Sequence, residues 1–210
     1  MVAQPGKTPR RAPRQGRSKA TFDAVLDAAA QILSHEGYEQ MTTNRIAVRA
    51  GTSVGSLYQY FPNKESLVIA LRDRHAEKMI EAFETIVASL MEAPLANAVP
   101  AIAQAMLASH NIDPELHANL NILVSHLGGG RRLVDKVEAR AVVVTRAYLE
   151  ARRDEIRPAN VERASFILVH TVYALAQQAA HHPQYRSNPA FVNDVADLVL
   201  RFLTKDPAVT

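Results

Sequence analysis

The sequence predicts an all-α protein of about nine helices, and two observations support this. From Ser18 onward, apolar residues recur at three- and four-residue spacings along nearly the whole chain, which is the period of an amphipathic helix. No segment alternates apolar and polar residues as a half-buried strand does, and the β-branched run at 142–144 lies among helix-forming residues. We therefore expect helices separated by turns that contain glycine or proline.

Residues 18–62 predict three helices that form a small N-terminal domain. The first helix ends at Gly37, and the second covers about 43–50 and stops at Gly51. The third begins after Ser53, whose side chain can cap it. The apolar face of the first helix consists of Phe22, Val25, Leu26, Ala29 and Leu33.

Residues 63–205 predict a larger C-terminal domain with six more helices. Asn63 can cap the first of them. The Asp-Pro-Glu sequence at 113–115 is a clear helix start, with an N-cap acid, a proline at the first helical position and a second acid near the positive end of the helix dipole. We expect these six helices at about 63–90, from between Pro94 and Pro100 to 111, 113–127, 131–156, 161–181 and 188–204.

The composition argues against a membrane protein, a secreted protein and most enzymes. The chain has no cysteine, no apolar run of about 20 residues and no secretory signal pattern, so we expect a cytoplasmic protein with no membrane contact. The eight histidines form no HExxH or similar ligand spacing, and neither GxSxG nor a phosphate-binding glycine loop occurs. We expect no catalytic residues, no metal and no cofactor.

Residues 42–61 carry the strongest functional signal. Two short helices are joined there by a tight turn at Gly51 and Thr52, which is the arrangement of a helix-turn-helix DNA-binding motif. A glycine at such a turn permits a positive φ that other residues adopt with strain. Pro62 cannot continue the second helix of the motif.

The second helix of this motif has a buried side and a polar side. At about 100° per residue, Leu57 and Phe61 lie on one side, and Val54 lies at its margin. The opposite side and its flanks carry Gly55, Ser56, Tyr58 and Gln59. Glutamine can read a base edge with two hydrogen bonds, and hydroxyl groups can contact phosphate. This side therefore suits a DNA groove.

The stretch from Arg17 to about Leu71 contains AAA at 28–30, GY at 37–38, TTNRIA at 42–47, RAG at 49–51 and VGSLYQYFPNKE at 54–65. With these residues it closely resembles the N-terminal domain of the TetR (tetracycline-repressor-like) family of regulators. The resemblance covers about a quarter of the chain and matches the family in both residue type and spacing.

The resemblance implies that the first three helices bind a pseudo-palindromic operator in double-stranded DNA. The DNA-binding residues it implies are Thr43, Val54, Gly55, Ser56, Tyr58, Gln59, Tyr60 and Lys64. Thr43 and Lys64 would hold the phosphate backbone, and the others would face the major groove or its walls. Packing against the first helix is the alternative for Tyr58 and Tyr60.

The resemblance also implies a homodimer formed through the last two long helices. The apolar stripes that suit this role are Phe166, Val169, Tyr173 and Ala176 on one helix, and Phe191, Val195, Leu198 and Phe202 on the other. Both stripes fit an intramolecular core equally well. Two-fold symmetry of the operator favours the dimer.

A small-molecule effector is a further implication of the resemblance, with a site between the fourth and eighth helices. The candidate lining residues are His75, Met79, Phe83, Met106, His110, His126, Tyr148, His170, Tyr173 and Gln177. Plain core packing is the alternative for Met79 and Phe83, and a satisfied core position is the alternative for the histidines. Several of them together would suit an aromatic or amphipathic molecule.

The sequence therefore predicts a sequence-specific DNA-binding transcriptional regulator, a repressor that an effector releases from its operator. Two alternatives stay open at this stage: an architectural DNA-binding protein without an effector, and an all-α enzyme. Saturable binding to one short pseudo-palindrome would separate a regulator from an architectural protein.

Positive charge is concentrated at the N-terminus. Residues 1–17 contain five Lys and Arg residues and no acidic residue, residues 18–64 are neutral overall, and the remainder carries a net charge of −2. The first seventeen residues also contain three prolines and no large aliphatic residue after Val2. We expect a disordered basic tail that either keeps the protein soluble or contacts DNA phosphates.

Deleting residues 1–16 tests the second role of the tail. If the tail contacts DNA, its loss weakens operator affinity and flattens the salt dependence of binding, because fewer counterions are released. Sequence preference should stay the same. Titrations of the full and shortened chains at several salt concentrations measure this, and an unchanged salt slope would show that the tail makes no DNA contact.

Overall fold

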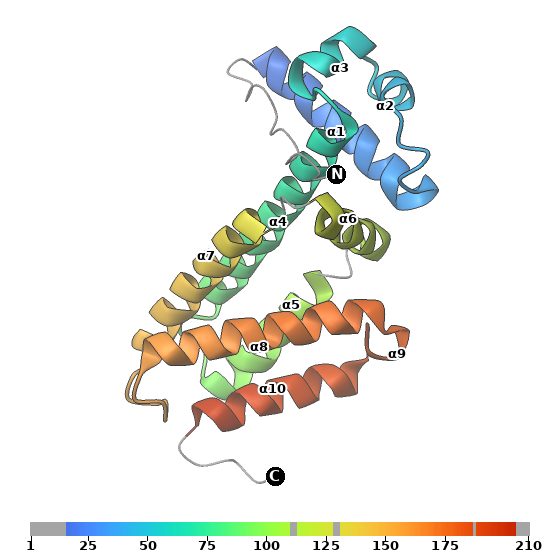
Figure 1. The fold of residues 1–210 in the computed structure, drawn as a ribbon. Helices are drawn as coiled ribbons and strands as arrows, with labels where there is room; N and C mark the ends of the chain where they lie inside the picture. The colour runs from blue at the N-terminus through green and yellow to red at the C-terminus, as the bar shows by residue number, and fades with distance from the viewer. Residues whose placement is uncertain (1–15, 110–112, 128–130, 187, 205–210) are drawn as a thin grey trace. The chain divides into compact units, whose positions relative to one another are not determined.

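The structure, a computed structural model, describes residues 16–109, 113–127, 131–186 and 188–204. Across these residues the chain forms ten α-helices and no strand, which confirms the all-α fold (Figure 1). The helix beyond the expected nine is α9, the four residues Pro183–Arg186. No helix within these ranges is both long and apolar enough to cross a membrane.

The chain packs as two compact units. Of the described residues, unit 1 comprises those up to 76 and those within 113–134, and unit 2 comprises the others. The helix α4, Lys64–Ser89, contributes to both. Packing thus divides the chain differently from the functional boundary at 62 and 63, because α6, Pro114–Leu127, packs with α1. The functional division, with its tail at 1–17, stays a prediction.

Unit 1 has a core shared by α1 (Gly16–Glu36), α2 (Thr43–Arg49), α3 (Val54–Tyr60), α6 and the start of α4. Phe61 stacks on Phe22 with 4.9 Å between ring centroids. Gly37, with φ of +82°, follows α1 in the left-handed region that favours glycine, so it ends the helix as predicted. The largest fully buried side chains of this core are Leu26, Ile32, Leu33, Met41, Ile46, Leu57, Phe61, Leu67, Leu71 and Leu120.

Hydrogen bonds as well as apolar contacts join α6 to α1. The Asp113 carboxylate accepts from the Leu116 backbone N–H at 2.9 Å, which confirms the predicted helix start, and from the Ser34 hydroxyl at 2.8 Å. The Asn119 side-chain amide donates to the Leu33 carbonyl at 3.1 Å. The first two turns of α6 are therefore joined by hydrogen bonds to the end of α1.

Unit 2 contains the rest of α4, α5 (Leu95–Ser109), α7 (Arg131–Glu150) from residue 135, α8 (Val161–His181), α9 and α10 (Pro189–Leu203). The helix α5 packs on both α10 and α8. Asn188 caps α10 by accepting from the Ala190 N–H at 2.9 Å, as its place before Pro189 predicts. Pro100 lies inside α5, where it lacks the N–H that a helical residue donates.

The expectation that the seventh helix continues to Ile156 is wrong. The helix α7 ends at Glu150, and turns follow it. Ile156 forms an isolated antiparallel bridge with Thr204, and the Arg157 N–H donates to the Leu203 carbonyl at 2.6 Å. In the sequence, Ile156 continues the apolar period of the helix. In the structure it lies beyond the helix and is buried against the end of α10. Periodicity alone does not distinguish an apolar residue inside a helix from one that packs just after it.

Arg152 is a buried cation in the turns after α7. It is 6% exposed, and its guanidinium donates to the carbonyls of Leu90 at 3.2 Å, Ala93 at 3.0 Å and Met91. These carbonyls lie just beyond α4. The same guanidinium lies over the Tyr148 ring, with its carbon 4.1 Å from the ring centroid. Arg152 therefore joins the ends of α4 and α7.

Replacing Arg152 with methionine should lower the free energy of unfolding by about 1–3 kcal/mol, because buried carbonyls lose their donors. Arg146, an exposed residue of α7, provides the matched control. The Arg146→Met variant should change stability by less than about 0.5 kcal/mol. Urea unfolding followed by circular dichroism measures both, and equal losses would contradict the role of Arg152.

Candidate functional site

The helices α2 and α3 form the helix-turn-helix that the sequence predicts. Thr42 caps α2 by accepting from the Arg45 N–H at 3.4 Å, and Ser53 caps α3 by accepting from the Ser56 N–H at 3.0 Å. Gly51 in the turn has φ of +63°. No atom within 4 Å would meet a Cβ there, so the backbone conformation, rather than lack of space, requires glycine.

One side of α3 is buried and the other is exposed, as the angular reading predicts. Leu57 and Phe61 are fully buried, and the half-buried Val54 packs against the same core. On the other side, Tyr58 is 46% exposed and Gln59 is also exposed. The burial of one apolar side therefore presents a polar side to solvent.

Two of the predicted DNA-contacting residues lie together on this surface. The Tyr58 hydroxyl is 3.5 Å from the Thr43 hydroxyl at the start of α2. The Ser56 hydroxyl lies 2.9 Å from that of Ser53, and Gly55, between these two serines in the chain, is exposed. The exposed side of α3 is thus lined by hydroxyl groups and one side-chain amide.

Tyr60 packs against the first helix. It is half-buried, its hydroxyl lies 2.8 Å from the Ser18 hydroxyl, and its ring meets Phe22 edge-on with 5.9 Å between centroids. This geometry is the packing alternative considered for Tyr60. The residue therefore links α3 to the beginning of α1.

Lys64 lies in the first turn of α4, beside Tyr38. Its ammonium is 3.6 Å from the centroid of the Tyr38 ring. Burial raises the pKa of Tyr38, and the carboxylates of Glu65 and Glu39 raise it further, so the phenol stays protonated at neutral pH. The pair places a cation and a hydroxyl donor side by side in unit 1, at the beginning of α4.

The arginines of α2 are paired within unit 1. Arg45 forms an ion pair with Glu36, and Arg49 lies 3.1 Å from the second oxygen of the same carboxylate. Arg45 also donates to the Gln40 side chain at 2.8 Å. The Glu36 carboxylate at the end of α1 therefore forms ion pairs with both arginines.

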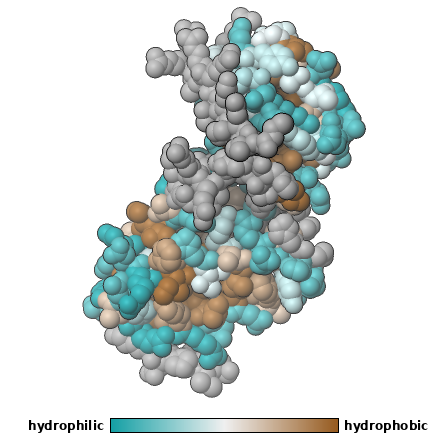
Figure 2. Space-filling view, in the orientation of Figure 1, coloured by the Kyte–Doolittle hydropathy of each residue, from teal (hydrophilic) through white to brown (hydrophobic). Residues whose placement is uncertain are grey.

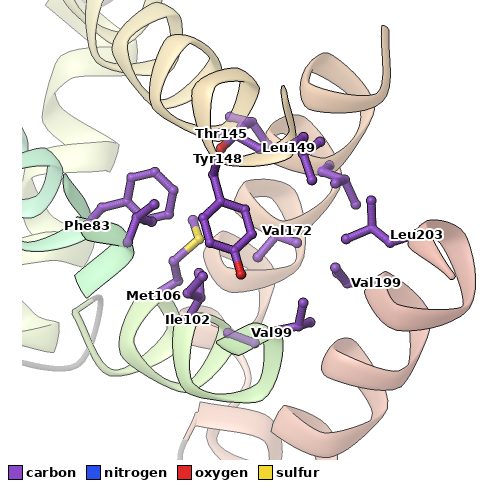
Figure 3. A pocket seen from close by; sticks show the side chains of 14 residues that line it. Phe83, Val99, Ile102, Met106, Thr145, Tyr148, Leu149, Val172, Val199 and Leu203 are labelled. Carbon is purple, nitrogen blue, oxygen red and sulfur yellow. The ribbon is translucent and has the colours of Figure 1, made fainter. Parts of the chain in front are cut away.

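Unit 2 contains an apolar cavity between α4, α5, α7, α8 and α10 (Figure 3). The empty space within and in front of its walls is about 590 Å³, a figure that includes open solvent at the mouth. Thr145 and Tyr148 are the polar residues among the fourteen that line it. Apolar members of the wall include Phe83, Ile102, Met106, Leu149, Val172 and Leu203.

Three effector candidates from the sequence, Phe83, Met106 and Tyr148, line this cavity. His75 lies in unit 1, where its Nε2 is 3.0 Å from Nδ1 of the buried His117. The side chains of His110 and His126 lie outside the described residues. The candidates of unit 2 that are absent from the cavity wall are Met79, His170, Tyr173 and Gln177.

The candidates away from the cavity have other neighbours. The Gln177 amide donates to the Tyr173 hydroxyl at 2.6 Å, and His170 Nδ1 lies 3.6 Å from a Glu138 oxygen. Among the described residues, no three His, Cys, Asp or Glu side chains group as metal ligands would.

Sequence reasoning did not identify the aliphatic part of the cavity wall. Val99, Leu149, Val172 and Leu203 lie on apolar helix faces that look the same in sequence whether they line a cavity or fill a core. The contribution of α10 also lies outside the helices expected to form the site. Phe83, Met106 and Tyr148, which carry aromatic or thioether groups, are the lining residues that the sequence indicated.

Tyr148 is 4% exposed, and its hydroxyl has no hydrogen-bond partner in the described structure. Burial raises the pKa of Tyr148; the Arg152 cation opposes the rise, and Glu155 adds to it. The phenol is therefore protonated at neutral pH. A buried hydroxyl without a partner loses its hydration without compensation.

Replacing Tyr148 with phenylalanine should therefore raise the free energy of unfolding of the ligand-free protein by about 1–3 kcal/mol, since the unpaired group is removed and the ring is kept. Thermal and urea unfolding measure the change. A loss of stability would show that the hydroxyl has a partner in solution. Thr145→Val, which also removes a hydroxyl from the cavity wall, is the matched control.

Comparison with known proteins supports both parts of this description. Residues 25–71 match the family described as bacterial regulatory proteins of the tetR family, and residues 94–203, more than half of the chain, match the tetracyclin repressor-like C-terminal domain. The chain is 29% identical over 146 residues to the A-factor receptor protein of Streptomyces griseus, covering 69% of this chain and 49% of that protein. It is 35% identical over 71 residues to the fatty acid metabolism regulator protein of Bacillus subtilis, covering 34% and 36%.

Solved structures share the fold. A TetR-family regulator from Pectobacterium atrosepticum superposes with a TM-score of 0.74 at 18% identity, covering 93% of this chain and all of that one. SmeT, the repressor of a Stenotrophomonas maltophilia multidrug efflux pump, gives 0.64 at 21% identity, covering 92% and 95%. The chain spans half or less of the curated relatives it matches.

The helix-turn-helix and the all-α fold together define a helical bacterial regulatory protein. The chain belongs to the TetR family. That family consists of regulatory proteins rather than enzymes, in agreement with the lack of catalytic motifs in the sequence.

Proposed function

We propose that this chain is a homodimeric, sequence-specific DNA-binding repressor that a small molecule releases from its operator. The observation that carries the proposal is the polar side of α3, which the burial of Leu57 and Phe61 directs toward solvent. A recognition helix with this division can enter the major groove. A cytoplasmic location and double-stranded DNA as partner follow from the same proposal.

The proposed contacts divide by chemistry. Thr43, Tyr58 and Lys64 bear hydroxyl or ammonium groups at the edges of the motif and are assigned to phosphates. Gln59 can bond a base edge, and Gly55 allows the backbone to approach closely. The other three predicted contacts are Val54, Ser56 and Tyr60. Each of them also makes a contact within unit 1 that holds α3 in place.

Replacing Gln59 with alanine should weaken binding to the preferred operator by about 1–3 kcal/mol and relax preference at the base pair that it reads. The same substitution at Gln31, an exposed residue of α1, is the matched control and should leave binding unchanged. Selection from a random DNA pool supplies the operator, and titration measures the affinity of each variant. Selection of sites without a pseudo-palindrome would contradict the proposal itself.

A dimer through α8 and α10 is the proposed assembly. Both helices leave large apolar side chains exposed in the single chain: Phe166 is 58% exposed, and Leu198 is 49% exposed. Figure 2 shows apolar residues gathered over the part of unit 2 that these helices present. Val169 and Val195, from the same predicted stripes, are buried instead. Each helix therefore has one side for its own core and an apolar side that a second copy can cover.

Replacing Phe166 with glutamate should weaken dimerisation at least about tenfold, because a charge replaces an aromatic group at the proposed interface. Val143, an apolar residue of α7 that is 66% exposed, provides the control, and Val143→Glu should leave the dimer intact. Sedimentation equilibrium measures both. Equal dimerisation of the Phe166 variant and the unmodified chain would place the interface elsewhere.

Release by an effector is the proposed regulation. SmeT, a repressor of the same fold, has been solved in a complex with triclosan. In this chain the cavity of unit 2 is the proposed site. An effector that binds the DNA-free conformation more tightly lowers operator affinity by the ratio of its two affinities, and DNA lowers effector affinity by the same factor.

A further inference from the structure

We propose that the ligand of the unit 2 cavity is a neutral, largely apolar molecule with one hydrogen-bond acceptor, and that the Tyr148 hydroxyl donates to this acceptor. The inference rests on the proposed function only in taking this cavity as the effector site. It adds the chemical class of the ligand and the residue that selects it.

The cavity wall makes an apolar ligand necessary. Twelve of the fourteen lining side chains are hydrocarbon or thioether groups, and none of the fourteen carries a charge. A ligand that fills such a space gains by leaving water in proportion to its apolar area. Each additional polar group on it would lose hydration without compensation.

Tyr148 provides one polar position inside this wall. The residue lies on α7, and Figure 3 shows its ring among the lining side chains with the oxygen directed away from α7, toward the side of the cavity that α5 forms. The hydroxyl is buried and has no partner in the described structure. A ligand oxygen placed there would satisfy a group that the protein leaves unpaired.

The surroundings of Tyr148 favour its role as a donor. The guanidinium of Arg152 lies over the ring, 4.1 Å from its centroid, and a cation at this place draws electron density from the ring and strengthens the O–H as a donor. Burial keeps the phenol protonated, since it raises the pKa of Tyr148. The matching ligand group is a carbonyl, ether or hydroxyl oxygen.

The same surroundings disfavour an anionic ligand. Arg152, the cation next to the cavity wall, already donates to the carbonyls of Leu90, Met91 and Ala93. One nitrogen of its guanidinium, Nη2, is therefore held at the backbone beyond α4. A carboxylate in the cavity would be desolvated against aliphatic side chains with one hydroxyl to compensate it.

Three probes of similar shape test this inference on the full chain without DNA. Benzophenone has an apolar body with one carbonyl acceptor, diphenylmethane lacks the acceptor, and 4-benzoylbenzoate adds a charge. Isothermal titration gives the affinity of each for the unmodified protein, Tyr148→Phe and Thr145→Val. Ultraviolet irradiation of bound benzophenone, followed by peptide mapping, identifies the helices next to the carbonyl.

We expect benzophenone to bind the unmodified protein more tightly than either other probe. Tyr148→Phe should weaken benzophenone binding about tenfold and leave diphenylmethane binding unchanged or tighter, as expected for the loss of one buried hydrogen bond. Thr145→Val should keep the preference for benzophenone. Photolabelling should fall on α5 or α8, two of the helices that line the cavity.

Four results would overturn the inference: no benzophenone binding up to its solubility limit, equal affinity in the Tyr148→Phe variant, tighter binding of 4-benzoylbenzoate, or labelling confined to residues outside the cavity. Circular dichroism and thermal unfolding of each variant exclude misfolding as the cause of a lost affinity. An operator titration with benzophenone is read separately. If benzophenone binds through Tyr148 but leaves operator affinity unchanged, the proposed regulation fails and the ligand assignment stands.

Discussion

The packing of α3 against α1 is the contact on which the DNA-binding surface depends. Leu57 and Phe61 are fully buried in it, and because successive residues of a helix are about 100° apart, fixing these two fixes the direction of every other side chain of α3. Phe22 holds the contact from the side of α1 through its stacking on Phe61. The polar side of α3 needs no stabilising contact of its own to face the solvent. Its orientation follows from the hydrophobic burial of the opposite side.

Unit 2 follows a different principle, in which a wall of aliphatic side chains surrounds space instead of filling it. Such a wall forfeits dispersion contacts that a filled core would make. Two polar groups next to this wall, the Arg152 guanidinium and the Tyr148 hydroxyl, differ in their contacts. Arg152 satisfies the backbone beyond α4 and lies over Tyr148, whereas the Tyr148 hydroxyl stays unpaired. The unpaired hydroxyl makes the ligand-free protein less stable. A ligand that accepts a hydrogen bond from it would remove this cost, and the difference would contribute to the binding free energy.

The sequence was most informative where local chemistry alone determines structure. The turn at Gly51, the caps at Ser53 and Asp113, and the buried side of α3 depend on residues close together in the chain. The end of α7 and the packing of α6 with α1 depend on distant partners, such as Thr204 and Leu33, which periodicity does not reveal. For the cavity the difficulty is chemical, since an aliphatic wall and an aliphatic core have the same pattern. Of the polar candidates, His170 and Gln177 have neighbours of their own, and His75 lies in unit 1.

The carboxylate of Glu36 has a consequence for how such a protein searches a genome. By pairing with both Arg45 and Arg49, it offsets one of the two positive charges that α2 would present to a phosphate backbone. For the proposed DNA-binding function, this lowers the sequence-independent part of the affinity, and a molecule on a random site would dissociate sooner. Genomes offer on the order of a million or more competing sites, and short residence on each of them leaves more molecules free to occupy the operator.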